Sequence, residues 1–155
     1  MSTPGHNVQA VRRLFEAGTD YIDSGERQPF EAALQELTSS ELVFVPSSAL
    51  ASGDPGPFRG HEGLIRQHDA IGREWEDFDV TVDDYVEVPP STVVLLGRLT
   101  ARRDDGAGYA MELGMVHRFE GGQLVSVHSF SSKRRALDEA GADDLDAGAR
   151  PEEQA

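Results

Sequence analysis

Apolar residues recur at helical spacing in the first half of the chain. Val8, Val11 and Phe15 share one face of an amphipathic helix that Asn7 is suited to begin and Gly25 to end. The pattern predicts three helices, over Asn7–Ser24, over a short stretch that starts at Pro29, and over Gly60–Trp75. A loop rich in Ser, Gly and Pro is expected from Ser47 to Pro57.

Apolar and polar residues alternate along the second half, which is typical of strands with one buried face. The pattern predicts a first short strand at Leu42–Val45, then Phe78–Val88, Thr92–Arg103, a hairpin from Tyr109 to Ser132, and a last helical turn or two at Lys133–Ala140. Short turns between long strands indicate an antiparallel meander. Three helices can cover only one face of such a sheet, so we expect an α+β layer with a cavity between helices and sheet.

The last hairpin sorts its residues onto two faces. We place a three-residue turn at Glu120–Gly122, which sets Phe119 opposite Gln123 and His117 opposite Val125. Because side chains alternate along a strand, one face is expected to carry Met111, Leu113, Met115, His117, Phe119, Val125, Val127, Ser129 and Ser131. This inner face is rich in methionine with a few polar groups, which suits a small-molecule pocket and also a plain core.

Length and charge narrow the possible functions. The 155 residues suit one domain, expected over residues 7–141, followed by an acidic tail at 142–155 that is expected to be disordered. The net charge of −14 disfavours nucleic acid and anionic membranes as partners. The absence of cysteine excludes thiol catalysis. No signal-peptide pattern or membrane-length apolar run occurs, so we expect a cytoplasmic protein.

Three short motifs carry a resemblance to a known superfamily. Phe58–Ile65 reads FRGHEGLI, Glu120–Leu124 reads EGGQL, and Arg135–Gly141 reads RALDEAG. With the order of elements, they resemble the nuclear transport factor two-like superfamily, and within it the SnoaL-like polyketide cyclase group. The resemblance covers residues 8–141 and implies a cystatin-like α+β fold, a curved antiparallel sheet forming a cone with three N-terminal helices. It implies little about function, because the superfamily hosts isomerases, cyclases, hydrolases, dehydratases and binding domains.

The catalytic carboxylates of the resembling families do not carry over to this chain. Ketosteroid isomerase-like relatives use a Tyr in the first helix, an Asp that ends the first strand and an acid in the penultimate strand. The matching positions hold Leu14, Val45 and Met115, none of which can act as an acid or a base. Polyketide cyclases use an Asp just after the last strand, where this chain has a serine within Phe130–Lys133.

Two histidines remain as candidate catalytic groups. His117 is expected on the inner sheet face, where a near-neutral pKa suits proton transfer; the alternative is a core histidine satisfied by a backbone carbonyl or a Tyr. His68 interrupts the apolar stripe of the third helix between Leu64 and Ile71, where it needs a ligand, Ser129 or water as a partner. Its alternative is a buried histidine hydrogen-bonded within the protein. Two histidines without a third ligand argue against a metal site.

Glu112 and His128 are expected on the outer face of the sheet. We place Thr100 opposite Glu112, with Arg98 and Arg102 diagonal to it, so cross-strand ion pairing explains this carboxylate without catalysis. Apolar residues on the same face, and the habit of the resembling superfamily, predict a homodimer through it. These residues are Val116, Leu124 and Phe130.

Two functional hypotheses follow. The first is a cyclase, isomerase or hydrolase without a cofactor, acting on an apolar oxygenated metabolite, polyketide-like or terpenoid-like, with His117 as acid/base and His68 in support. Its substrate-binding residues are expected to be Phe15, Trp75, Met111, Leu113, Met115, Val127, Ser129 and Ser131. The second is a non-catalytic domain of the same fold that binds a small hydrophobic molecule or serves in dimerisation. The missing carboxylates favour the second hypothesis, and the two histidines on apolar faces favour the first.

Overall fold

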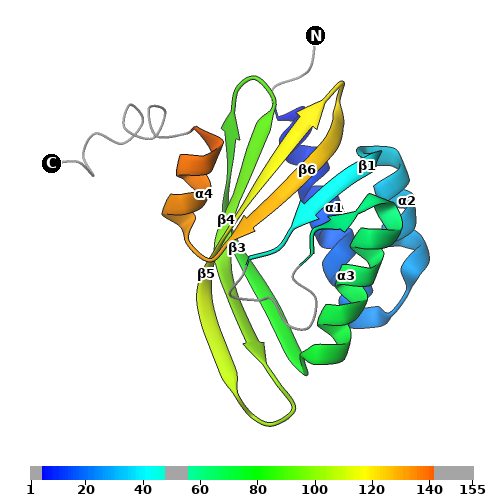
Figure 1. Ribbon diagram of the computed structural model, residues 1–155, viewed down its shortest axis with the longest axis vertical. Helices are drawn as coiled ribbons and strands as arrows, with labels where there is room; N and C mark the ends of the chain where they lie inside the picture. The colour runs from blue at the N-terminus through cyan, green and yellow to red at the C-terminus, as the bar shows by residue number, and fades with distance from the viewer. Residues whose placement is uncertain (1–4, 48–55, 142–155) are drawn as a thin grey trace, which may run out of the picture.

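Helices cover both faces of one curved sheet in the computed structural model, which describes residues 5–47 and 56–141 (Figure 1). The helices are α1 (His6–Ser24), α2 (Arg27–Leu37), α3 (Gly60–Glu74) and α4 (Lys133–Ala140). The strands are β1 (Thr38–Val45), β2 (Phe58–Arg59), β3 (Asp77–Val88), β4 (Thr92–Arg102), β5 (Gly108–Glu120) and β6 (Gln123–Phe130). The predicted α+β class with three N-terminal helices is confirmed. The predicted acidic tail and most of the predicted Ser47–Pro57 loop lie outside the described residues.

Local chemistry sets the ends of the first two helices. Gly25 ends α1 in the left-handed conformation, and its N–H donates to the Tyr21 carbonyl at 2.8 Å, as expected of a C-terminal glycine. α2 begins at Arg27, so Pro29 is its third residue rather than the first. Proline is tolerated there because the N–H groups of a first helical turn have no partner within the helix. Within the described residues, no helix is long and apolar enough to cross a membrane.

The sheet is mixed rather than wholly antiparallel, which corrects the sequence-based expectation. Its strand order is β2-β1-β6-β5-β4-β3, and the pairing of β1 with β6 is parallel, with Phe44 opposite Val127. A parallel pair needs a long crossover connection, which α3 and the strands β3 to β5 provide here. The alternation of residues within β1 carries no information about which distant strand becomes its neighbour.

The turn of the β5–β6 hairpin also differs from the prediction. Gly121–Gly122 forms a two-residue turn with both φ angles positive, and Phe119 lies opposite Leu124. A bulge in β6 then adds one residue, so that His117 lies opposite Val127. The residue opposite His117 is therefore displaced by two positions along β6 from the predicted partner, Val125. Because side chains alternate with period two, every residue beyond the bulge keeps its predicted face.

Two apolar clusters lie on opposite sides of the sheet. The larger one lies between α1–α3 and the inner face and includes Leu124, which corrects the prediction that Leu124 faces outward. The smaller one lies under α4, where Leu137 packs with Val116 and Phe130 of the sheet. Gly114 lies below this helix, where an added Cβ would collide with the Cβ of Ala136. The three residues that motivated the predicted homodimer are thus covered within the same chain, and the homodimer stays a prediction without that support.

Candidate functional site

A cavity of about 130 Å³ lies between the first three helices and the inner face of the sheet. The helices line it with Leu14, Phe15, Thr19, Ile22, Phe30, Leu64, Gln67, His68, Ala70 and Ile71. The strands line it with Phe44, Phe58, Phe78, Val80, Leu99, Leu113, Met115, His117, Val127 and Ser129. Pro46, Ser47 and Trp75 complete the wall. No Asp, Glu, Lys or Arg occurs in this wall among the residues that the structure describes.

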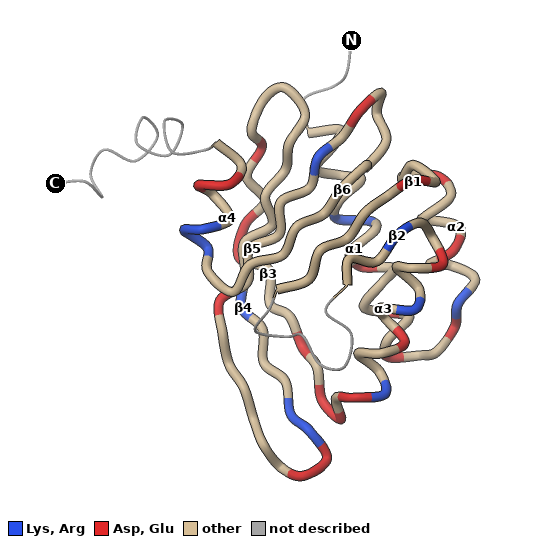
Figure 2. The backbone as a smooth tube through the Cα atoms, viewed as in Figure 1, with Lys and Arg blue, Asp and Glu red and all other residues tan. Residues whose placement is uncertain are grey.

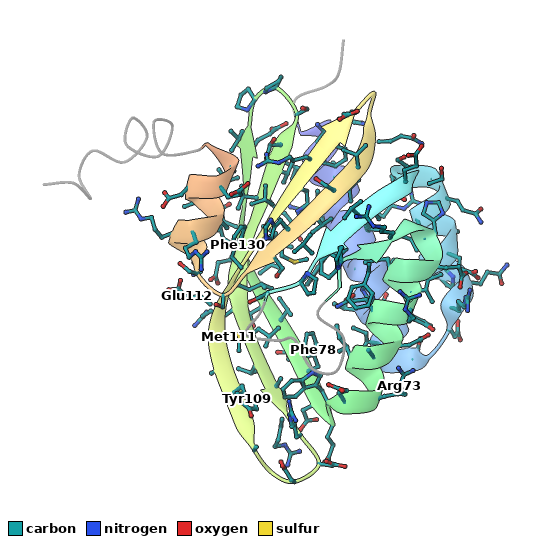
Figure 3. All side chains as sticks on the ribbon, viewed as in Figure 1. Arg73, Phe78, Tyr109, Met111, Glu112 and Phe130 are labelled. Atoms are coloured by element: carbon teal, nitrogen blue, oxygen red, sulfur yellow. The ribbon has the colours of Figure 1, made fainter. Side chains whose placement is uncertain are left out.

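Most of the residues predicted to be catalytic or substrate-binding line this cavity. They are Phe15, His68, Trp75, Leu113, Met115, His117, Val127 and Ser129, and their roles stay predictions. Met111 and Ser131 do not line it. Met111 packs beside Trp75 and Leu99, on the part of β5 that extends beyond β6, and Figure 3 shows it near Tyr109 toward the β4–β5 turn. Ser131 is exposed because β6 ends one residue earlier, and alternation of faces ends with the strand.

His117 is held as a neutral ring in the wall. Its side chain is 4% exposed, and its Nδ1–H donates to the carbonyl of Met115 at 3.1 Å. Burial lowers the pKa of His117 to about 4, against the opposite influence of the backbone at Met115 and Val93. A neutral imidazole has one donor and one acceptor, so a donating Nδ1 leaves Nε2, at the tip of the ring, as a hydrogen-bond acceptor.

His68 has the same tautomer for a similar reason. Its Nδ1–H donates to the carbonyl of Leu64, one helical turn earlier, at 2.9 Å, and burial lowers its pKa to about 4. The ring packs on Phe30, with 4.5 Å between centroids. A Cβ added to Gly18 would lie 2.6 Å from Nε2, so the glycine makes room for the ring. Both histidines thus form the intramolecular hydrogen bond of the structural alternative, while both still face the cavity.

Two polar residues of the helices that line the wall, and Ser47 after β1, were not among the predicted candidates. The Oε1 atom of Gln67 is buried and has no hydrogen-bond partner among the described residues. Thr19 also lines the cavity. Helical spacing could have identified both, because Thr19 follows Phe15 by four residues and Gln67 precedes Ile71 by four.

A second, larger hollow of about 710 Å³ runs between α1 and β3. Five carboxylates and a single cation, Arg12, line it: Glu16, Asp23, Asp79, Asp83 and Asp84. It adjoins the inner cavity, because Phe15, Thr19, Ile22, Phe78 and Val80 line both. Figure 2 shows acidic residues spread over helices and strands alike, so acidic lining does not by itself mark a site. The inner cavity is the better candidate because its apolar walls carry a few convergent polar groups.

Glu112 and His128 line neither of these two spaces. Glu112 lies opposite Arg98 rather than Thr100, and its Oε1 accepts the backbone N–H of Lys133 at 2.9 Å. The predicted ion pairing is wrong, because the Glu112 carboxylate instead accepts a hydrogen bond from the first residue of α4 (Figure 3). His128 stacks on Phe130 with 4.3 Å between centroids. Within residues 5–47 and 56–141, no group of three or more His, Asp or Glu side chains is arranged to hold a metal ion.

Comparisons with known proteins agree with this architecture. A family model described as a SnoaL-like domain matches residues 11–127. An NTF2-like protein of unknown function from Burkholderia pseudomallei has 18% identity and a TM-score of 0.67, over 89% of this chain and 97% of that one. A putative SnoaL-like polyketide cyclase from a Jannaschia species has 18% identity and a TM-score of 0.65, over 92% and 97%. TerC, co-crystallised with polyporic acid, has 12% identity and a TM-score of 0.63, over 88% and 98%. No curated protein matches the sequence.

Proposed function

The chain belongs to the SnoaL-like domain family, and from this premise we propose that its cavity binds a small apolar, oxygen-bearing molecule on which His117 acts as a base. The observation that carries the proposal is a buried imidazole on the wall of an apolar cavity. Its Nδ1–H donates a hydrogen bond to the Met115 carbonyl, so Nε2 is the ring nitrogen that can accept a proton. The co-crystallisation of TerC with polyporic acid supports small-molecule binding by this fold.

The lowered pKa of His117 favours a base over an acid as its starting role. A ring with a pKa of about 4 is deprotonated at neutral pH and has no proton to donate from Nε2. When Nε2 takes a proton from a bound molecule, the Met115 carbonyl already accepts from Nδ1–H and stabilises the resulting imidazolium. We assign His68 and Ser129 the role of orienting the bound molecule, because both line the same cavity.

The test compares two histidines on opposite faces of one hairpin. We expect His117→Gln to lower kcat by about a hundredfold or more on a substrate found by screening small oxygenated compounds, because glutamine bonds to the ligand without transferring a proton. His128→Gln is the matched control, since this residue stacks on Phe130 outside the cavity. Near-full turnover by His117→Gln would disprove the catalytic assignment.

A non-catalytic binding domain is the second candidate. It is favoured by the absence of carboxylates from the described cavity wall, and by Leu14 and Met115, which line the cavity where the resembling enzymes have acidic or phenolic groups. In that case His117→Gln changes the dissociation constant of the bound molecule modestly, and no compound in the screen is converted by the unsubstituted protein.

A further inference from the structure

We infer that the cavity selects a small, uncharged ring compound that carries a hydroxyl group, with phenol as the simplest probe. The inference rests on the proposed function, because it names the class of molecule that the same cavity accepts. Three independent features of the described wall carry it: its charge, the direction of its hydrogen bonds, and its size.

The wall excludes ions of either sign. No charged side chain stands among its described residues, so an anion or a cation would lose its hydration without gaining a counter-charge. The hollow beside it adds a further barrier to anions, because five carboxylates and a single arginine line that surface. An uncharged molecule meets neither penalty.

Three acceptor atoms of the wall favour a ligand that donates a hydrogen bond. His117 and His68 each donate from Nδ1 to a backbone carbonyl, so the Nε2 atom of each ring is an acceptor. The Oε1 atom of Gln67 is a third acceptor, buried and without a partner among the described residues. His68 Nε2 lies against Gly18, which leaves His117 and Gln67 as the better placed of the three. A hydroxyl group supplies the missing donor, whereas an ether, a ketone or a hydrocarbon does not.

The volume of the inner cavity suits a ligand of one ring. The cavity measures about 130 Å³. An engineered protein cavity of about 150 Å³ holds benzene, and pockets for drug-sized molecules are at least about twice as large. Aromatic and aliphatic side chains such as Phe30, Leu113 and Met115 provide apolar surface for the ring.

The experiment is calorimetric titration at pH 7 with phenol, toluene and benzoate, which share one ring. Toluene replaces the hydroxyl with a methyl group of similar size, and benzoate adds a negative charge. We expect phenol to bind more tightly than toluene and benzoate not to bind. His117→Phe should lower the ratio of phenol affinity to toluene affinity by about tenfold, because one hydrogen bond is lost. His128→Phe, on the outer face, should leave the ratio unchanged.

The outcomes separate this inference from the proposed function. If none of the three compounds binds, this inference fails, whereas the proposed function is judged separately by the screen and by His117→Gln. If toluene binds at least as tightly as phenol and His117→Phe leaves the ratio unchanged, the cavity binds apolar molecules but the inference about the hydroxyl group is wrong. Tightest binding by benzoate would also overturn it. Nitrogen-15 NMR of the unsubstituted protein gives an independent reading that does not depend on the folding of a variant: phenol should shift the His117 Nε2 resonance, and toluene should not.

Discussion

The two faces of the β5–β6 hairpin differ in what covers them. On the outer face, α4 of the same chain packs against Val116 and Phe130, and Glu112 accepts the N–H of the first residue of that helix. On the inner face, α1–α3 leave a cavity, and the His117 ring lies in its wall with Nδ1–H donating to the Met115 carbonyl. Both faces carry an apolar cluster, yet α4 of the same chain covers the outer cluster and the inner face leaves room for another molecule.

This difference shows that apolar composition alone does not identify a binding site. Val116 and Met115 are neighbours in the sequence and point to opposite faces, but Val116 is fully buried under protein while Met115 borders open space. Packed interiors have few voids, so a space flanked by polar groups with unused hydrogen-bonding capacity is the informative feature.

The largest expected loss of stability comes from a substitution on the outer face, which α4 covers. Leu137→Ala removes a side chain of α4 that is 8% exposed and should lower the free energy of unfolding by about 2–5 kcal/mol. Met115→Ala on the cavity wall should cost about 1 kcal/mol, because this side chain already borders empty space and loses fewer contacts. Urea denaturation with a common m-value measures both. Equal losses would show that the inner face is packed as tightly as the outer one.

The next effect is a loss of stability in acid that originates on the inner face. The pKa of His117 is about 4 in the folded protein and about 6.5 when unfolded, so the unfolded state binds the proton first as the pH falls. Its contribution is complete above about pH 6.5 and is lost toward pH 4, with a limit of about 3 kcal/mol for a shift of this size.

Substitution of the ring identifies the source of this acid sensitivity. His117→Gln should reduce the fall in unfolding free energy between pH 6.5 and 4 without abolishing it, because His68 titrates over the same range, and His128→Gln should leave the fall unchanged. Denaturation midpoints at a series of pH values measure the slope. An unchanged slope in His117→Gln would assign the loss to other groups, with His68, whose pKa is also about 4, as the next to replace.

The smallest effect tests the close approach of α1 to His68. Gly18→Ala places a Cβ at 2.6 Å from Nε2, and the forced movement of the ring should cost about 1 kcal/mol. In a His68→Ala background the clash is gone, and the same change should stabilise the helix by about 0.5–1 kcal/mol. This reversal of sign in a double-mutant cycle distinguishes contact with the ring from a general intolerance of alanine at this position.

The sequence by itself determined the three N-terminal helices, the long strands and the faces of most residues in the last hairpin, with Leu124 and Ser131 as exceptions. The predicted bounds of α1, α3, β3 and β4 agree with the structure to within one residue. Met115, His117, Val127 and Ser129 face inward as predicted, even though the turn was assigned wrongly. Both successes rest on periodicity, which is a local property: a period of two survives a displacement of two positions.

Only the tertiary structure decided the remaining features. They are the parallel pairing of β1 with β6, the position of α4 over Gly114, the exclusion of Met111 and Ser131 from the cavity, and the tautomers of the two histidines. Each depends on which segments meet, and β1 and β6 are separated by about half of the chain. Contacts between distant segments leave no periodic trace in either one, because the energy that selects them comes from packing whole faces together.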